Sequence, residues 1–126
     1  MIENDIATRD FMQDILSDEG HEVHCCAWAG ATVEIVARAQ PQIVIVDLNP
    51  IDPDSAVAFL KQFRQHHDTQ QASVLISCTS THLLNRLHDQ LQRLECATML
   101  KPFELDDFLN HVDTLCADPQ TRCATA

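Results

Sequence analysis

The sequence predicts an α/β fold in which helices cover both faces of a parallel β-sheet. Strand-like and helix-like segments alternate along the chain, which is the order expected when crossover helices connect parallel strands. Residues 43–46 are four β-branched residues without polar alternation, and residues 73–78 are of the same kind, so both are expected to be strands buried on both faces. These observations predict a three-layer α/β/α sandwich.

Composition limits the protein to one domain. The 126 residues are 45% hydrophobic, so we expect one domain over residues 1–116 and a flexible tail over residues 117–126, which lack apolar periodicity. The net charge of −11 and the absence of a Lys/Arg cluster argue against direct binding to nucleic acid. No apolar run approaches the roughly 20 residues that cross a membrane, and no signal-peptide pattern is present, so we expect a cytoplasmic protein without a membrane partner.

Each expected element has a recognisable boundary. The strands are short apolar segments, at residues 1–2, 21–27, 43–47, 73–78 and 96–101. The helices carry apolar residues three and four positions apart, at residues 7–17, 31–39, 56–66, 82–94 and 103–116. Gly20 follows the first helix as a stop signal, Pro41 ends the second, and Asp54 or Ser55 is the expected N-cap of the third.

The helix at residues 82–94 carries a stripe of leucines at alternating spacings of three and four. Most of this stripe is expected to face the core. The portion around Leu83 and Leu87 is a candidate surface for a homodimer or another partner.

Polar side chains follow the carboxyl ends of the predicted strands, where open α/β sheets form their ligand crevices. They are Glu3, Asn4 and Asp5 after the first strand, Asp47 after the third, Ser77, Cys78 and Thr79 after the fourth, and Lys101 after the fifth. Clustered carboxylates suit Mg²⁺, which takes one or two of them together with water and phosphate oxygens. The set predicts phosphoryl transfer, with Asp47 attacking phosphorus and Lys101 and a hydroxyl or thiol contacting the phosphoryl oxygens. The alternative for Lys101 is a purely structural ion pair with Asp47.

Four segments of the chain resemble the receiver domain of two-component response regulators. They follow the family's order and spacing and cover nearly the whole chain, as ENDIATRDFMQDILSDEG, IVIVDLNP, VLISCTS and MLKPFELDDFL. The resemblance implies a flavodoxin-like, CheY-like fold with five parallel strands in the order 2-1-3-4-5. Because the first strand is central in this order and has only two residues, either the chain start omits residues or the sheet is weakened between its second and third strands.

The resemblance implies that a histidine kinase or a histidine phosphotransfer protein phosphorylates Asp47 in the presence of Mg²⁺. Glu3 and Asn4 stand at the family's acidic metal-binding pair, and the main-chain carbonyl of Asn49 would complete the metal site. Since Asn4 replaces a carboxylate, Mg²⁺ binding should be weaker, unless the neighbouring Asp5 contributes. A receiver domain is a signalling module rather than an enzyme, and its output would pass through a downstream protein or an output domain outside this chain.

Further positions receive roles from the same resemblance. Cys78 stands where the family has a Ser or Thr that contacts the phosphoryl group, and a shift of one residue would bring Ser77 or Thr79 into this role. Lys101 matches the family's lysine, whose peptide bond to the following proline, here Pro102, is often cis.

The sequence leaves two alternative functions, one from departures from the family pattern and one from the layered fold. Asn4, Cys78 and Thr98, which replaces a switching aromatic, favour a degenerate receiver that binds partners without phosphorylation. Asp47 and Lys101 oppose that interpretation. An FMN-binding, flavodoxin-like protein would share the layered fold, but it would need a Ser/Thr/Gly-rich loop after the first strand, where this chain is acidic.

Overall fold

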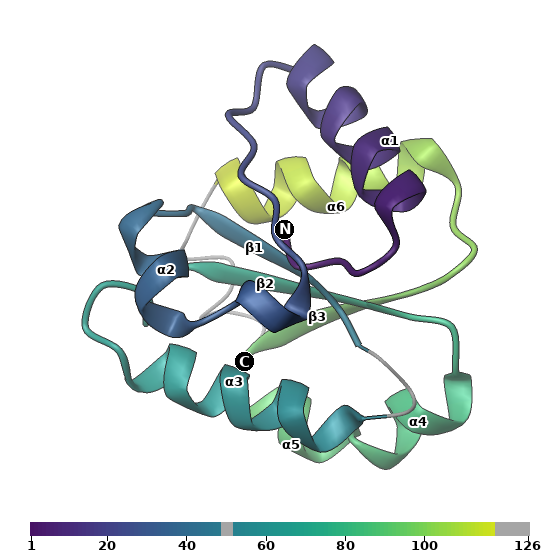
Figure 1. Cartoon of the computed structure of the whole chain (residues 1–126). Coiled ribbons are helices and arrows are strands. Elements are labelled where there is room, and N and C mark those ends of the chain that lie inside the picture. Colours follow the sequence, from purple (N-terminus) through teal and green to yellow (C-terminus); the bar gives the residue numbers. More distant parts are fainter. Residues whose placement is uncertain (49–51, 118–126) are drawn as a thin grey trace.

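Three parallel strands form the centre of the structure, a computed structural model in which residues 1–48 and 52–117 are described (Figure 1). The strands are β1 (Ile43–Asp47), β2 (Ser73–Cys78) and β3 (Cys96–Leu100), in the spatial order β1-β2-β3. All of β2 and the middle of β1 are buried, as expected for strands covered on both faces. The register pairs Asp47 with Ser77 and Ser77 with Met99, so the carboxyl ends of the strands meet at one edge.

Ile2 extends the sheet beyond β1 by a single residue. It forms isolated parallel bridges with Val46 on one side and with Cys26 on the other. Its N–H donates to Ile45 at 2.8 Å, and its carbonyl oxygen accepts from Asp47 at 2.9 Å. In space the order is Cys26, Ile2, β1, β2 and β3, but Cys26 and Ile2 form only isolated bridges. The described residues form three strands, so the five strands expected in the order 2-1-3-4-5 are not confirmed.

The strand predicted at residues 21–27 is absent from the described part of the chain. The segment beside it, residues 1–3, is too short to pair with more than one of its residues. Cys26 exchanges main-chain hydrogen bonds with this segment, with Met1 and Glu3 at 3.0 Å. Residues 21–25 therefore have no strand alongside them. They and the outer edge of β1 instead line a cavity of about 710 Å³.

Helices cover both faces of the sheet (Figure 1). One face carries α1 (Ile6–Asp18) and α6 (Leu105–Ala117), which pack on the sheet through Met12, Leu16, Phe108 and Val112. The other face carries α2 (Val33–Arg38), α3 (Pro53–Gln65), α4 (Thr81–Arg86) and α5 (His88–Arg93), and a short 3-10 helix, η1 (Trp28–Gly30), precedes α2. The predicted three-layer arrangement is confirmed.

The local sequence explains two helix boundaries, the end of α1 and the start of α3. Gly20 follows α1 with a φ of 91°, a left-handed conformation that glycine adopts at little cost, as its role as a stop signal requires. Asp52, rather than Asp54 or Ser55, caps α3, because its side chain accepts the N–H of Ser55 at 3.3 Å and Pro53 occupies the first turn.

The predicted helix at residues 82–94 is two short helices that meet at Leu87. The main-chain hydrogen bonds from Leu87 to Leu83 and from Leu91 to Leu87 continue across the junction, at 3.0 and 2.9 Å. Leu83 and Leu87 are each only 5% exposed and belong to the core. These two leucines are therefore not exposed for a partner, contrary to the expectation, and a homodimer through the rest of this face stays a prediction.

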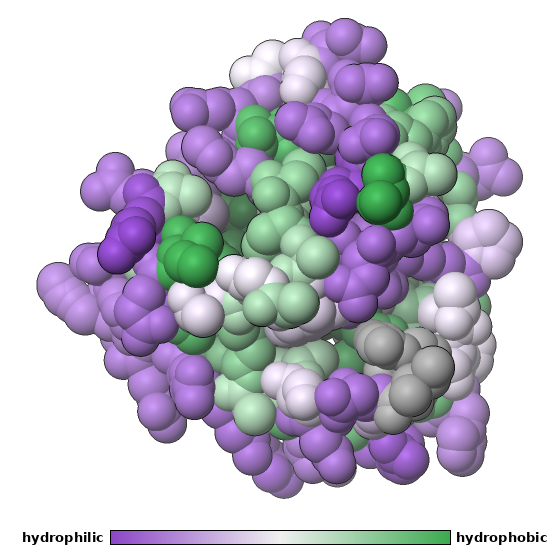
Figure 2. Space-filling model, viewed as in Figure 1, coloured by the Kyte–Doolittle hydropathy of each residue, from purple (hydrophilic) through white to green (hydrophobic). Residues whose placement is uncertain are grey.

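The face of the domain seen in Figure 2 has hydrophilic residues along most of its outline, in keeping with the net charge of −11, and less polar residues towards its centre. No helix within residues 1–48 and 52–117 has the length and apolar character needed to cross a membrane. Of the predicted tail, Ala117 is the last residue of α6, and residues 118–126 lie outside the described part of the chain.

Candidate functional site

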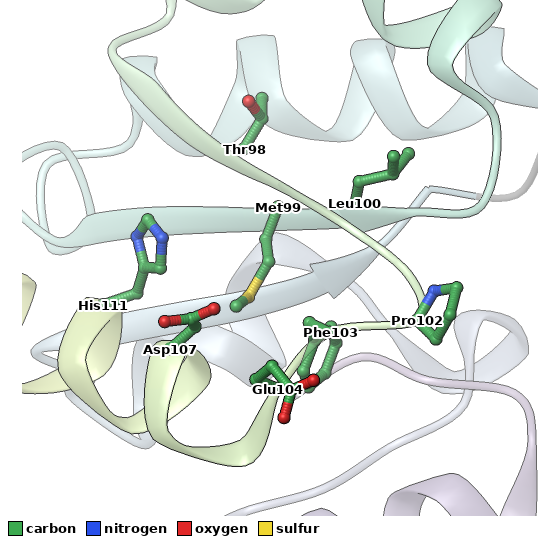
Figure 3. Close-up of a pocket in the computed structure, with 8 residues that line it drawn as sticks. All are labelled: Thr98, Met99, Leu100, Pro102, Phe103, Glu104, Asp107 and His111. Carbon is green, nitrogen blue, oxygen red and sulfur yellow. The ribbon is translucent and has the colours of Figure 1, made fainter.

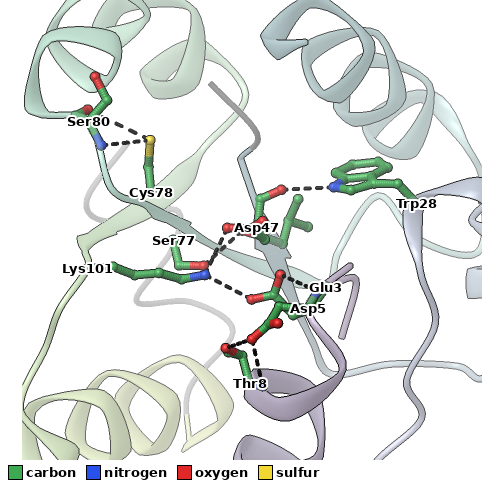
Figure 4. Close-up of polar contacts among 10 residues, drawn as sticks. Glu3, Asp5, Thr8, Trp28, Asp47, Ser77, Cys78, Ser80 and Lys101 are labelled. Carbon is green, nitrogen blue, oxygen red and sulfur yellow. Dashed lines mark hydrogen bonds and ion pairs between the residues drawn. The ribbon is translucent and has the colours of Figure 1, made fainter. Parts of the chain in front are cut away.

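Lys101 joins two carboxylates at the carboxyl edge of the sheet. Its Nζ donates to Glu3 Oε1 and to Asp47 Oδ1, each at 2.8 Å (Figure 4). The side chains are 18%, 5% and 21% exposed for Lys101, Glu3 and Asp47. Because water screens the cluster poorly, its charges interact more strongly than surface charges do. The structure thus brings together three of the residues that the sequence predicted at this edge.

Sheet pairing explains why these distant residues meet. Asp47 ends β1, and its N–H donates to Ile2 at 2.9 Å, which places Glu3 beside it. The N–H of Lys101 donates to the carbonyl oxygen of Cys78 at 2.8 Å and extends the pairing of β3 with β2 by one residue. The Lys101–Pro102 peptide bond is cis, as predicted.

The two carboxylates keep Lys101 charged. Burial alone lowers the pKa of Lys101, but the hydrogen bonds and charges of Asp47 and Glu3 outweigh it, and the net pKa lies above the ordinary value of 10.5. The ammonium group is therefore protonated at neutral pH. Its contribution to stability is fully present below pH 10.5 and is lost only as the pH rises through the higher folded value.

The residues that follow Glu3 have other partners. The side-chain oxygen of Asn4 accepts the main-chain N–H of Trp28 at 2.8 Å. Asp5 is the N-cap of α1, and its carboxylate accepts from the main-chain N–H of Thr8 at 3.0 Å and from its hydroxyl (Figure 4). The bonds from Thr8 hold the pKa of Asp5 below its ordinary value. Asn4 and Asp5 thus belong to the same rim as Glu3, but neither is bonded to Lys101.

Trp28 adjoins the site, although no motif points to it. Its indole Nε1–H donates to the main-chain carbonyl oxygen of Asp47 at 2.9 Å (Figure 4). The available signal was its position, because the only tryptophan of the chain directly follows the segment 21–27 and so lies at the same rim as Asp47.

Ser77, rather than Cys78, shares a face of the sheet with Asp47. Ser77 is the register partner of Asp47, and paired residues of parallel strands point to the same side. Cys78 is fully buried on the opposite face, where its thiol lies 3.4 Å from the main-chain nitrogen of Ser80. Figure 4 shows the thiol turned towards Ser80 and Ser77 beside the Lys101 ammonium group. The structure therefore does not bring Cys78 into the cluster.

Solved structures with the same fold are chemotaxis and response-regulator proteins. The chain is similar to chemotaxis protein CheY4 of Vibrio cholerae, with a TM-score of 0.75 and 20% identity over 90% of this chain and 93% of that chain. It is also similar to a response regulator receiver domain from Rhodospirillum rubrum, with a TM-score of 0.61 and 20% identity over 92% of this chain and 88% of that chain. The chain has the receiver fold. No protein-family model matches its sequence, and no curated protein matches it significantly.

Within this receiver fold, Glu3 and Asp47 are the residues that fit a metal. Mg²⁺ is usually bound through one or two carboxylates with water completing its shell, so these two carboxylates suit it. The oxygen of Asn4 is already bonded to Trp28, and Asn49, whose carbonyl was expected to complete the site, lies outside the described residues. In the described part of the chain, no three His, Cys, Asp or Glu side chains gather as a ready metal site.

Thr98 lies on the outer strand of the receiver fold. Its side chain is exposed and lines a cavity of about 470 Å³ together with Leu100, Phe103 and His111. Figure 3 shows Thr98 and Leu100 on one side of β3 and Met99 on the other, as strand alternation requires. Because threonine has no ring to move between exposed and buried positions, this position cannot act as an aromatic switch.

Proposed function

We propose that the protein is a phosphoacceptor receiver domain, in which Asp47 accepts a phosphoryl group from a histidine kinase or a histidine phosphotransfer protein with Mg²⁺ as cofactor. The observation that carries the proposal is the Lys101 ammonium group, which donates to both Asp47 and Glu3 at 2.8 Å. A structural ion pair needs one carboxylate. A second carboxylate buried beside the first carries a desolvation cost, which a phosphoryl-transfer site would explain. The receiver fold supports the same conclusion.

The proposed reaction is an in-line displacement at phosphorus. An oxygen of Asp47 forms the new P–O bond, the P–N bond to the donor histidine breaks, and the leaving imidazole takes up a proton. The ammonium group of Lys101 offsets the charge on the phosphoryl oxygens, and the hydroxyl of Ser77 is the donor on the same face as Asp47. Mg²⁺, when bound, supplies further charge neutralisation at the phosphoryl oxygens.

Phosphorylation by a small donor tests this proposal. Incubation with acetyl phosphate and Mg²⁺ is expected to add the mass of one phosphoryl group, measured on the intact protein. The isosteric variant Asp47→Asn should show no adduct, because an amide oxygen does not attack phosphorus. If the wild-type protein takes up no phosphate although it is folded, the phosphoacceptor proposal is wrong and the phosphorylation-independent interaction module is left.

Replacing Asn4 with aspartate should tighten Mg²⁺ binding, by about threefold or more, because a carboxylate adds charge to the ligand set. One carboxylate oxygen can keep the bond to the Trp28 N–H, while the other faces the rim. The affinity can be measured from the fluorescence of Trp28, the only tryptophan of the chain. Asn4→Ala is the matched control and should not tighten binding. Equal affinities of the wild type and Asn4→Asp would mean that position 4 does not face the metal.

The partner would approach over the ends of two helices. Ile6 at the start of α1 and Leu105 at the start of α6 are 62% and 43% exposed. Both follow site residues closely, Ile6 after Glu3 and Leu105 after Lys101. Exposed apolar side chains at the edge of a polar site suit contact with an apolar helical surface of the kinase or phosphotransfer protein.

A further inference from the structure

Trp28 donates two hydrogen bonds to residues of the site, one from its indole and one from its main chain. The indole Nε1–H donates to the carbonyl oxygen of Asp47 at 2.9 Å, and the main-chain N–H donates to the side chain of Asn4 at 2.8 Å. Figure 4 shows the indole approaching Asp47 from the side opposite to Lys101. The main chain of Asp47 and its carboxylate are thus held by different residues from different directions.

The indole N–H replaces a main-chain hydrogen bond that the edge of the sheet lacks. In a parallel ladder, one residue of a strand pairs with two positions of its neighbour, and the bonds follow at even spacing. Ile2 donates to Ile45 at 2.8 Å and accepts from Asp47 at 2.9 Å. The next bond in this series would run from the N–H of Asn4 to the carbonyl oxygen of Asp47. The chain instead turns at Asn4 into α1, and the indole N–H of Trp28 donates to that oxygen.

This bond fixes the peptide group that follows Asp47. The carbonyl oxygen of that peptide accepts from Trp28, and its N–H, which belongs to Leu48, donates to the carbonyl oxygen of Ser77 at 2.8 Å. Leu48 is fully buried. Because both polar groups of the peptide are bonded, its plane cannot rotate freely, and the direction of the adjoining Asp47 side chain is restricted with it.

The indole itself is held by aromatic packing. The Trp28 ring meets the Phe59 ring edge-on, with centroids 5.4 Å apart and planes at 88°. Phe59 in turn stacks on Phe63 in the next turn of α3, at 6.1 Å. A donor held in this way loses little conformational entropy when it binds its acceptor, so the contact serves for positioning.

We propose that Trp28 is a positioning residue of the Asp47 site. Its indole N–H completes the edge of the sheet at Asp47 and holds the Asp47–Leu48 peptide, so that the carboxylate points towards Lys101 and the incoming phosphorus. The kinetic part of this inference rests on the proposed phosphoacceptor function, whereas the structural part does not.

Two substitutions separate the N–H group from the packing of the ring. Trp28→Phe removes the indole N–H and keeps an aromatic ring against Phe59. Replacement of the single tryptophan by benzothienylalanine keeps the shape and exchanges only the N–H for sulfur. Phe63→Leu is the matched control, because it weakens the same aromatic core, leaves Phe59 against the indole and keeps the N–H. All three leave the main-chain bond from residue 28 to Asn4 in place.

Phosphorylation rate and stability are then compared. Without the indole N–H, adduct formation from acetyl phosphate at saturating Mg²⁺ should slow by about three- to tenfold, the effect of one net hydrogen bond. Phe63→Leu should lower the melting temperature at least as much as benzothienylalanine does, but leave the rate of the folded protein close to that of the wild type. Wild-type rates in both variants that lack the N–H, or losses that follow melting temperature in all three proteins, would overturn the inference.

Hydrogen exchange tests the same contact without phosphorylation. The amide of Leu48 should exchange at least about tenfold faster in Trp28→Phe than in Phe63→Leu, because the peptide loses its second hydrogen bond only in the former. Equal exchange in the two variants would overturn the inference. If the wild type takes up no phosphate but the exchange differs as expected, the phosphoacceptor function fails while the positioning of the peptide by Trp28 stands.

Discussion

Replacing Lys101 with methionine is expected to slow the phosphorylation of Asp47 by about 10²- to 10³-fold, the usual loss when one donor to a developing anionic oxygen is removed. Methionine keeps most of the length of the side chain and removes the charge. The same change should destabilise the protein by about 2 kcal/mol at pH 7, because Glu3 and Asp47 are left side by side without a cation. Partial exposure of Asp47 keeps the loss below that of a fully buried pair. Initial rates of adduct formation and urea unfolding measure the two effects.

A second substitution distinguishes the two roles of Lys101. Adding Glu3→Gln to Lys101→Met should recover at least about half of the lost stability at pH 7, but not the rate. Wild-type rates in Lys101→Met would contradict the site, and wild-type stability at pH 7 would contradict the ion-pair network.

The parts of the site that were predictable are those at the ends of parallel strands. Asp47 and Lys101 each end or follow an apolar run, and in-register parallel strands bring such residues to one edge whatever lies between them. The same rule placed Glu3 there, although Ile2 pairs through only one residue on each side. Strand position alone was therefore sufficient for the Glu3–Asp47–Lys101 cluster and for the layered fold.

The features that the sequence did not predict depend on contacts without a local pattern. The bond from Trp28 to Asp47 joins a side chain to a main-chain oxygen, and no periodicity records it. The absence of a strand at residues 21–25 depends on how few residues lie alongside, not on the apolar character of the segment. Leu87 carries the core stripe through the junction of α4 and α5, so the leucine spacing was preserved while the helix was divided.

Arg64 is a further residue that only the structure reveals, and its loss should have the largest effect on stability. Its guanidinium group donates to the carbonyl oxygens of Leu94, Gln70, Ala72 and Glu95, at 2.7, 3.2, 2.5 and 3.1 Å. These carbonyls belong to the turns before β2 and β3, and Glu95 has a φ of 57°, which is unfavourable for a residue with a side chain. Arg64→Ala would leave partly buried carbonyls without this donor, and we expect a loss of about 3 kcal/mol in the free energy of unfolding, measured by urea titration.

Two control variants test whether the loss of stability in Arg64→Ala comes from the several N–H donors of the guanidinium group. Lys61→Ala changes an exposed cation in the same helix and should alter stability by no more than about 0.5 kcal/mol. Arg64→Lys keeps the charge, but a single ammonium group cannot reach all four of these divergent carbonyls, so it should lose about half as much stability as Arg64→Ala. Because Arg64 binds the turns at the amino ends of β2 and β3, away from Asp47, the folded Arg64→Ala protein should be phosphorylated at the wild-type rate. A loss below about 1 kcal/mol would show that other donors replace the guanidinium group at these turns.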